Sequence, residues 1–297
     1  MSEEQTAPPV RQQSYEVDGP IEVDVAIGAG RVEVRLSAEP GAHVEVRHDP
    51  AGSSPWMQGM SSFISWVSGQ FGDEAIELSP AEAVRQTRID QAAGRLVVRA
   101  PKALPLRGVP VAVTVRAPAG SHVTARTGPA PIVVTGPAGR LELHTGSGEV
   151  TADRADGLAN VNSGSGSVRL GPMQVGLRAR TGTGDLEVTA VGGPTTLFTG
   201  SGDVWVGAVS GDLMARTGSG DLTVADAASG QIELQTGSGA IRVGVRSGSP
   251  AEIDLSSGTG EARSELPLSG SRPESAMALR IRGRTASGSA VVSPATA

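Results

Sequence analysis

The sequence predicts an all-β fold, a parallel β-solenoid, and two observations carry this prediction. The segment Thr145-Gly146-Ser147-Gly148-Glu149-Val150 returns in closely related form at Ser163, Thr181, Thr199 and Thr217, each time 18 residues further on. The chain is rich in glycine, with 41 residues, and poor in aromatic side chains, with three Trp, three Phe and one Tyr. A fixed period of this length is typical of a stack of coils that share one core.

Each coil is expected to hold two short strands. The fifth and seventh positions after the opening Thr are apolar in every copy and the position between them is mostly polar, as in a strand buried on one face. The inward residues of the first strand are Ile132, Val150, Val168, Leu186, Val204, Leu222 and Ile241, and Val134, Ala152, Leu170, Val188, Val206, Val224 and Val243. Those of the second strand are Leu141, Ala159, Leu177, Thr195 and Leu213, and Leu143, Val161, Ala179, Leu197 and Ala215.

A parallel stack explains why like residues recur in one column, because each residue then lies about 4.8 Å from its counterpart in the next coil. The Thr and Ser columns are expected to form hydroxyl ladders. Glycine in the turn is expected to provide positive φ and room for close approach between coils. The connections are predicted to be right-handed, as parallel crossovers nearly always are.

A single solenoid domain is expected over residues 15–292, between a disordered polar tail at 1–14 and a C-terminal tail at 293–297. The regular repeats occupy residues 127–262 and are preceded by less regular strands. Residues 264–278, with Pro267, Pro273 and several Ser, are predicted to be a loop. After it, residues 279–292 are predicted to form the closing coil.

Residues 51–90 interrupt the strands and are predicted to be an α-helical insertion. One face of a helix over 56–71 carries six apolar side chains, namely Trp56, Met60, Phe63, Ile64, Val67 and Phe71. This face could cover the solenoid, dock a partner protein or lie on a membrane. The membrane alternative is disfavoured because no Lys or Arg occurs between Arg47 and Arg85. Ser79-Pro80-Ala81-Glu82 predicts the start of a short second helix.

The most regular column of ionisable residues is Asp185, Asp203 and Asp221, which follow the turn glycines of three successive coils. They are interpreted as turn residues that keep the sheet edge soluble, with weak cation binding as the alternative. The four histidines, His43, His48, His122 and His144, lack the spacing of metal ligands. No Gly-rich segment forms a phosphate-binding motif. The sequence therefore predicts no catalytic residues, no metal site and no cofactor.

Charge and composition limit the partners. The net charge of −6 disfavours nucleic acid and anionic lipid. There is no cysteine, so disulfides and thiolate metal sites are excluded. The N-terminal residues lack a basic segment followed by an apolar one, so a cytoplasmic location is expected. No stretch approaches the roughly 18 apolar residues of a membrane span.

The repeat unit T-G-S-G-D-[VL]-x-V, as in residues 199–206, resembles the β-strand-repeat "putative adhesin" family, a bacterial domain of unknown function. So do residues 95–102 and 117–123. The resemblance covers residues 15–292 and implies the solenoid fold, with an adhesin label that implies export. It supplies no catalytic residues. The Arg- and Ala-rich usage, with Lys102 the only lysine, looks like an actinobacterial member.

The resulting functional hypothesis is a non-catalytic binding or scaffolding module that contacts a protein partner or another copy of itself. An adhesin-like surface protein or self-assembling structural element is the alternative. A carbohydrate-active β-helix enzyme is the third hypothesis. The repeats offer that hypothesis only Trp205 and Phe198 as aromatic platforms.

Overall fold

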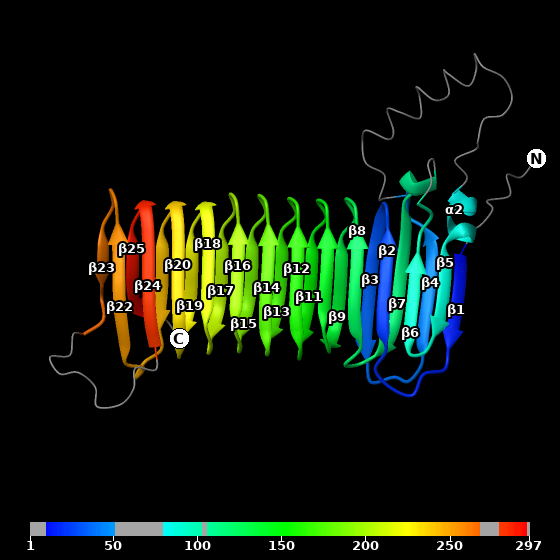
Figure 1. The fold of residues 1–297 in the computed structure, drawn as a ribbon, viewed down its shortest axis with the longest axis horizontal. Coiled ribbons are helices and arrows are strands. Elements are labelled where there is room, and N and C mark those ends of the chain that lie inside the picture. Colours follow the sequence, from blue (N-terminus) through cyan, green and yellow to red (C-terminus); the bar gives the residue numbers. More distant parts are fainter. Residues whose placement is uncertain (1–9, 51–79, 103–105, 268–278, 296–297) are drawn as a thin grey trace, which may run out of the picture.

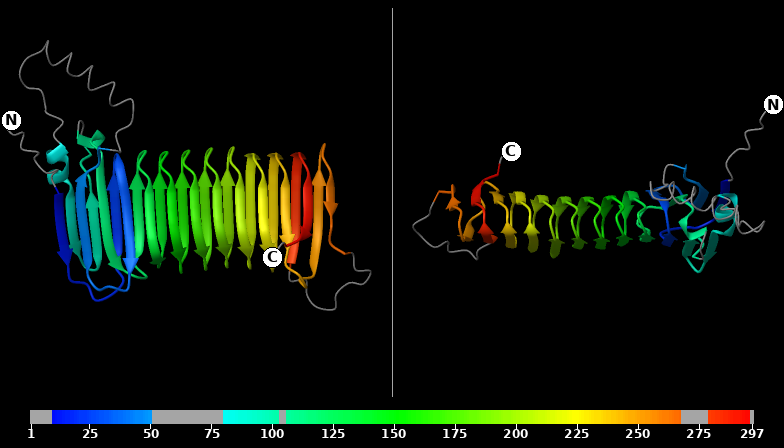
Figure 2. Two further views of the ribbon diagram at one scale, coloured as in Figure 1. Left: turned by 180° about the vertical axis from the view of Figure 1, so that it is seen from behind. Right: turned by 90° about the horizontal axis from the view of Figure 1, so that it is seen from above.

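The computed structural model describes residues 10–50, 80–102, 106–267 and 279–295. The described strands form two long sheets that face each other along an elongated stack, which confirms the β-solenoid (Figure 1). Viewed along a perpendicular direction, the stack is a row of coils with one strand of each coil in either sheet (Figure 2).

Sheet A contains 13 strands. In spatial order they are β1 (Val10–Tyr15), β4 (Ala42–His48), β7 (Val111–Pro118), β3 (Gly30–Ser37), β9 (Ile132–Ala138), β11 (Val150–Ala155), β13 (Val168–Met173), β15 (Leu186–Val191), β17 (Val204–Val209), β19 (Leu222–Ala227), β21 (Ile241–Val245), β25 (Ala290–Pro294) and β23 (Ala262–Ser264).

Sheet B contains 12 strands. In spatial order they are β22 (Ala251–Ser257), β24 (Leu279–Ser287), β20 (Gly230–Ser238), β18 (Leu213–Ser219), β16 (Thr195–Thr199), β14 (Gly176–Thr181), β12 (Leu158–Ser163), β10 (Leu141–Thr145), β8 (His122–Thr127), β2 (Glu22–Ile27), β6 (Arg95–Arg99) and β5 (Arg88–Ala92).

In the regular coils, strands pair in parallel with each residue opposite its counterpart in the next repeat. Val206, for example, lies between Val188 and Val224. Both inward columns predicted for the first strand are buried, and none of their members is more than 2% exposed. The second strand's inward columns are buried as well. The period-two alternation therefore identified the core correctly.

The turn glycines are required for close approach between coils, but not for the positive φ that was expected. A Cβ built on Gly184 would lie 2.3 Å from the carbonyl oxygen of Gly166 in the preceding coil. Among the described glycines, positive φ occurs at the equivalent turn position only outside the regular repeats, at Gly30 and Gly288. In the regular repeats the expectation about φ was wrong because the turn forms without positive φ, while stacking leaves no room for a side chain.

The threonine column does not form the expected hydroxyl ladder. Most of its hydroxyls instead donate to a turn carbonyl of the preceding coil, as from Thr199 Oγ1 to Gly184 O at 3.0 Å, whereas Ser163 Oγ has no partner among the described residues. Thr181, Thr217, Thr236 and Thr285 make the equivalent bond to Gly166, Gly202, Gly220 and Gly239. A buried backbone carbonyl without a hydrogen-bond donor is costly, so the hydroxyl bonds to the carbonyl and not to the hydroxyl of the next coil. The Thr side chain thus fastens one turn to the next.

The N-terminal strands are arranged in the sheets in a different order from their order in the sequence. β2 lies between β6 and β8, and β3 lies between β7 and β9. Beyond them the pairing becomes antiparallel, in β4–β7, β5–β6 and β1–β4. The prediction that residues 1–14 form a disordered tail was wrong for residues 10–14, which belong to β1. The free edge of β4 supplies backbone partners, so an exposed polar segment forms a strand without an apolar face. Arg11 also donates to the carbonyl of Thr87 at 2.6 Å.

At the opposite end, residues 279–294 do not form the closing coil. The β24–β25 coil lies between the β20–β21 coil and the β22–β23 coil, so residues 251–264 come last in space (Figure 1). Leu279 and Ile281 are fully buried there, whereas Ile253 and Leu255 on β22 are half-buried. The more apolar coil takes the interior position. The terminal strand carries Glu252 and Asp254, which form ion pairs with β24.

The predicted second helix is present as α2 (Pro80–Gln86), with Glu82 in its first turn and Ala83 and Val84 buried. A short 3-10 helix follows at Leu106–Gly108. The predicted helix over 56–71 lies outside the described residues. Among the described residues, no helix is long and apolar enough to cross a membrane.

Candidate functional site

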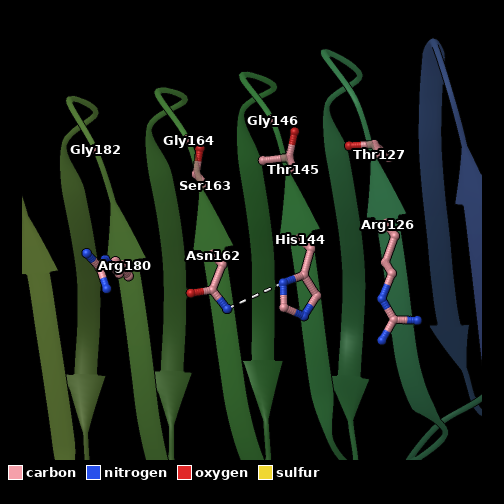
Figure 3. A pocket seen from close by; sticks show the side chains of 10 residues that line it. All are labelled: Arg126, Thr127, His144, Thr145, Gly146, Asn162, Ser163, Gly164, Arg180 and Gly182. Carbon is pink, nitrogen blue, oxygen red and sulfur yellow. Dashed lines mark hydrogen bonds between the residues drawn. The ribbon is translucent and has the colours of Figure 1, made fainter.

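The outward residues of sheet B form rows that run from coil to coil. One row lies just before the Thr column and passes from Arg126 to His144, Asn162 and Arg180, one residue on each of β8, β10, β12 and β14 (Figure 3). These residues project outward because a buried aliphatic residue directly precedes each of them and side chains alternate along a strand. The solenoid register alone therefore places four polar side chains, far apart in the sequence, in one line.

An open groove of about 510 Å³ follows this row beside the Gly-rich turns. Its lining residues are Arg126, Thr127, His144, Thr145, Gly146, Asn162, Ser163, Gly164, Arg180 and Gly182 (Figure 3). The side chains that project into it are hydrogen-bonding groups, and no carboxylate lines it. A groove of this shape can hold part of an elongated ligand but does not enclose a small one.

Two lining residues, Arg126 and His144, share the carboxylate of Glu142, which lies outside the groove lining. Arg126 Nη2 lies 2.7 Å and His144 Nε2 lies 3.2 Å from Oε1 of Glu142. Asn162 Nδ2 lies 3.4 Å from His144 Nδ1. These contacts hold the side chains across the strands and leave the far end of the groove, at Arg180, without a negative charge.

Arg178 and Arg180 on β14 differ from most other strand arginines because no carboxylate pairs with either of them among the described residues. Arg180 lies over the ring of Phe198, 4.9 Å from its centroid. Arg178 lies between Asn160 on β12 and Thr196 on β16. The strands β12, β14, β16 and β18 contain no Asp or Glu. Their outer face is therefore a positively charged surface on a chain whose net charge is −6.

The aspartate column predicted from the sequence has a structural role that its geometry explains. Asp185 Oδ1 accepts the backbone N–H of Asp203 at 2.9 Å, and Asp203 Oδ1 accepts that of Asp221 at 2.8 Å. Asp221 continues the series to Ala240 at 2.8 Å and also pairs with Arg242. Each carboxylate thus caps a backbone donor of the next coil. In the parts of the chain that the structure describes, no group of three or more His, Asp or Glu is arranged to hold a metal ion.

The backbone bond from Ala240, and then the bond from Arg242, lower the pKa of Asp221. A carboxyl group with a lowered pKa stabilises the fold above its unfolded pKa, and that stabilisation is lost as pH falls through the folded pKa. We expect Asp221→Asn to melt below the parent at pH 7, because the amide keeps the acceptor but loses the charge. The difference should shrink as pH falls below the ordinary Asp pKa and disappear below the lowered pKa of the folded state, as measured by thermal melts from pH 7 downward. A difference that is constant with pH would contradict the assignment.

The remaining predicted positions are separated by the fold. Trp205 lies on β17 of sheet A and Phe198 on β16 of sheet B, each 39% exposed, so they do not form one aromatic platform. The six residues of the apolar helix face, from Trp56 to Phe71, lie outside the described residues.

The sequence analysis did not identify the positively charged outer face of β12, β14, β16 and β18, which is called the arginine surface below. For the second strand the columns were aligned only for inward residues, and the only functional role considered for His144 was that of a metal ligand. Aligning the outward column of the second strand would have shown Arg126, His144, Asn162, Arg180, Phe198 and Arg216 in one row. Unlike the aspartate column, this row does not repeat one residue type, so only its shared lack of acidic residues marks it.

Comparison with known families settles the classification. The profile of the family described as Toastrack DUF4097 matches residues 113–293, which is more than half of the chain. The chain belongs to the Toastrack DUF4097 family. The Toastrack match includes every regular coil and the whole arginine surface, and it excludes β1–β6. A comparison with curated proteins found no match.

Several solved structures resemble this Toastrack protein over nearly the full length. A putative adhesin from Bacteroides fragilis NCTC 9343 is 11% identical, with 96% of this chain and 97% of that chain covered and a TM-score of 0.45. A putative lipid binding protein from Parabacteroides distasonis ATCC 8503 is 8% identical, with 97% and 95% covered and a TM-score of 0.38. At such identities and scores, these likenesses carry no information about what this Toastrack protein binds.

Proposed function

We propose that the protein is a non-catalytic binding module in which the solenoid is a rigid scaffold and the outer face of sheet B contacts the ligand. The observation that carries this proposal is the run of four neighbouring strands without a single acidic residue, next to an open groove. Parallel pairing on both sides holds these strands in register, so their side chains form a pre-organised surface.

The ionisable groups also favour binding over catalysis. Among the described residues, the shifted pKa values are raised for Arg35, Arg95 and Arg246 and lowered for Glu82 and Asp221. Both directions stabilise the ionised form, and each has an ion pair or hydrogen bond as its first cause. Carboxylates and arginines need a pKa displaced toward neutrality to act as general acids or bases at neutral pH, and none of these shifts has that direction.

We expect ligand capture to depend on sheet B and not on sheet A. The sheet B variant is Arg126→Ser/His144→Ser/Asn162→Ser, and the matched sheet A variant is Thr151→Ser/Arg169→Ser/Glu187→Ser in the neighbouring coils. Immobilised parent and variants are compared for what each retains from a lysate of the source organism. The proposal requires a component that the sheet A variant retains and the sheet B variant loses. Loss from the sheet A variant alone would place the binding surface on the opposite face.

The adhesin-like or self-assembling alternative is favoured by one feature of the C-terminal end. The last strands, β22 and β23, have no further described strand beyond them, and Ile253 and Leu255 of β22 are only half-buried. A free strand edge with apolar neighbours can pair with another chain. Sedimentation over a range of concentrations tests this alternative, because end-to-end pairing produces species that grow with concentration.

The cytoplasmic location and the actinobacterial origin stay predictions. Cell fractionation with an antibody to the solenoid tests the location. We also propose that residues 15–292 fold as one domain, since one hydrophobic core runs from Ile21 to Val292.

A further inference from the structure

We propose that the arginine surface of sheet B binds a linear anionic glycan, whose carboxylate or sulfate groups pair with Arg178 and Arg180. This inference rests on the proposed function, because it names the ligand class for the same face. It requires three steps: that the ligand is anionic, that it is elongated and that it is a glycan.

The anionic character follows from two arginines that lack a counter-charge. Arg178 and Arg180 are two positions apart on one strand and project from the same side, with Cα atoms roughly 7 Å apart. Most arginines in the regular coils have a carboxylate partner, as Arg126 has Glu142 and Arg216 has Glu233. Guanidinium groups favour bidentate pairing with planar or tetrahedral oxyanions. The pair on β14 therefore offers two unused oxyanion sites beside the amides of Asn160 and Asn162.

The elongated shape follows from the extent of the positive surface. The acid-free strands β12 to β18 cross three coil spacings, about 14 Å, and the outward row extends from Arg126 to Arg216 over five, about 24 Å. Arg126 and Arg216 at its two ends pair with Glu142 and Glu233. A second groove of about 330 Å³ continues it toward the N-terminal coils and shares Arg126 and Thr127 with the first. Lys102 and Arg107 line this second groove, again without a carboxylate. A single small anion would occupy only a fraction of this path, whereas a polymer could follow it.

A glycan fits this surface better than a peptide or a nucleic acid. Peptides often bind a sheet by adding a strand to a free edge, but β12, β14 and β16 are paired on both sides. Single-stranded nucleic acids stack their bases on exposed aromatic rings. On these strands the one aromatic ring is Phe198, and Arg180 covers it. A glycan needs only side-chain contacts, since its hydroxyl groups can use Asn and Thr while its charged groups use Arg.

Binding of the full chain is measured by isothermal titration with sodium polygalacturonate, dextran sulfate and, as the neutral control, unmodified dextran. We expect the parent to bind at least one of the charged polymers and not dextran, with affinity that falls as salt increases. The first two polymers distinguish a carboxylate from a sulfate ligand. Arg178→Ser/Arg180→Ser should weaken binding about tenfold or more, because two charge-assisted contacts are lost.

The matched control is Arg154→Ser/Arg169→Ser, which removes the same charge from sheet A in neighbouring coils. It should bind within about twofold of the parent, and thermal melts should show that both variants are folded. No binding of either charged polymer, or equal loss in both variants, would overturn the proposal. So would tighter binding to anionic liposomes or to duplex DNA. If the polymers fail while lysate capture still depends on sheet B, the ligand class is wrong and the proposed function stands.

Discussion

Val206→Asp is expected to destabilise the protein by several kcal/mol, enough to unfold the central coils at moderate temperature. Val206 is fully buried on β17 between Val188 and Val224, and the side chains around it are aliphatic. A carboxylate at this position would have no hydrogen-bond donor within the core, and an unpaired buried charge is among the most costly single substitutions. Urea unfolding and thermal melts followed by circular dichroism measure the loss.

Thr223→Asp is the matched control, because Thr223 lies on the adjacent strand one position out of the buried column. Its side chain faces outward between Trp205 and Arg242. We expect this substitution to change the free energy of unfolding by less than about 0.5 kcal/mol. Equal losses for the two variants would contradict this register, and a larger loss for Thr223→Asp would mean that the two faces of the strand are exchanged.

The regular coils could be predicted from the sequence because one local rule operates throughout them. A residue such as Val206 has the same neighbours on both sides as every other member of its column, so a column of aliphatic residues is also a column of core residues. The parallel register follows from the same identity. No long-range information is needed beyond the period itself.

The two ends could not be predicted in the same way because several coils there satisfy the rule equally. Residues 251–257 and 279–285 both alternate apolar and charged residues, and both pair in parallel register, β22 with β24 and β24 with β20. Their order in space is decided by how well each fills the interior. Leu279 and Ile281 are completely buried, a property of the packed structure that periodicity does not reveal. The strand β1 was not predicted because its own residues show no core pattern. It forms a strand by pairing with the free edge of β4.

The candidate site was not predicted from the sequence because it is marked only by a difference in charge between neighbouring columns. The aspartate column repeats one residue type and was visible, yet its carboxylates accept backbone N–H groups of the next coil. The arginine surface mixes Arg, Asn, Thr, Met and Phe. It becomes apparent only when the charges of neighbouring coils are placed side by side and their counter-charges are found missing. A column with a structural role repeats one residue type because every coil stacks in the same way. A binding surface contains different residue types because the chemical groups of its ligand differ along its length.

Gly184→Ala is expected to lower stability by about 2–4 kcal/mol, although a single methyl group is added. The new Cβ would lie 2.3 Å from the oxygen, 2.5 Å from the carbon of the Gly166 carbonyl and 2.8 Å from the nitrogen of Ser167. All three atoms are backbone, so no side chain can move aside. Relief requires the two coils to separate at this turn. Separation would stretch the backbone bond from Gly182 to Gly164, which is 2.9 Å long.

Two further contacts make the turn at Gly184 sensitive to this separation. Gly184 N–H donates to Thr181 Oγ1 at 3.2 Å, and its carbonyl accepts Thr199 Oγ1 at 3.0 Å. The substitution therefore affects the coils before and after it. Replacing glycine would by itself stabilise the protein by about 0.4–1 kcal/mol through the unfolded state, so the measured loss is the clash minus this gain.

Thr183→Ala, at the exposed position next to Gly184 in the same turn, is the control for changing the turn without adding bulk. It should leave the melting temperature within about 2 °C of the parent. Gly176→Ala provides an intermediate case, because its Cβ would meet the Pro194 oxygen at 3.1 Å and the movable Leu158 side chain at 3.2 Å. We expect losses in the order Gly184, Gly176, Thr183. If Gly184→Ala were as stable as Thr183→Ala, the turns would not be in contact and the coils would be spaced by something other than glycine.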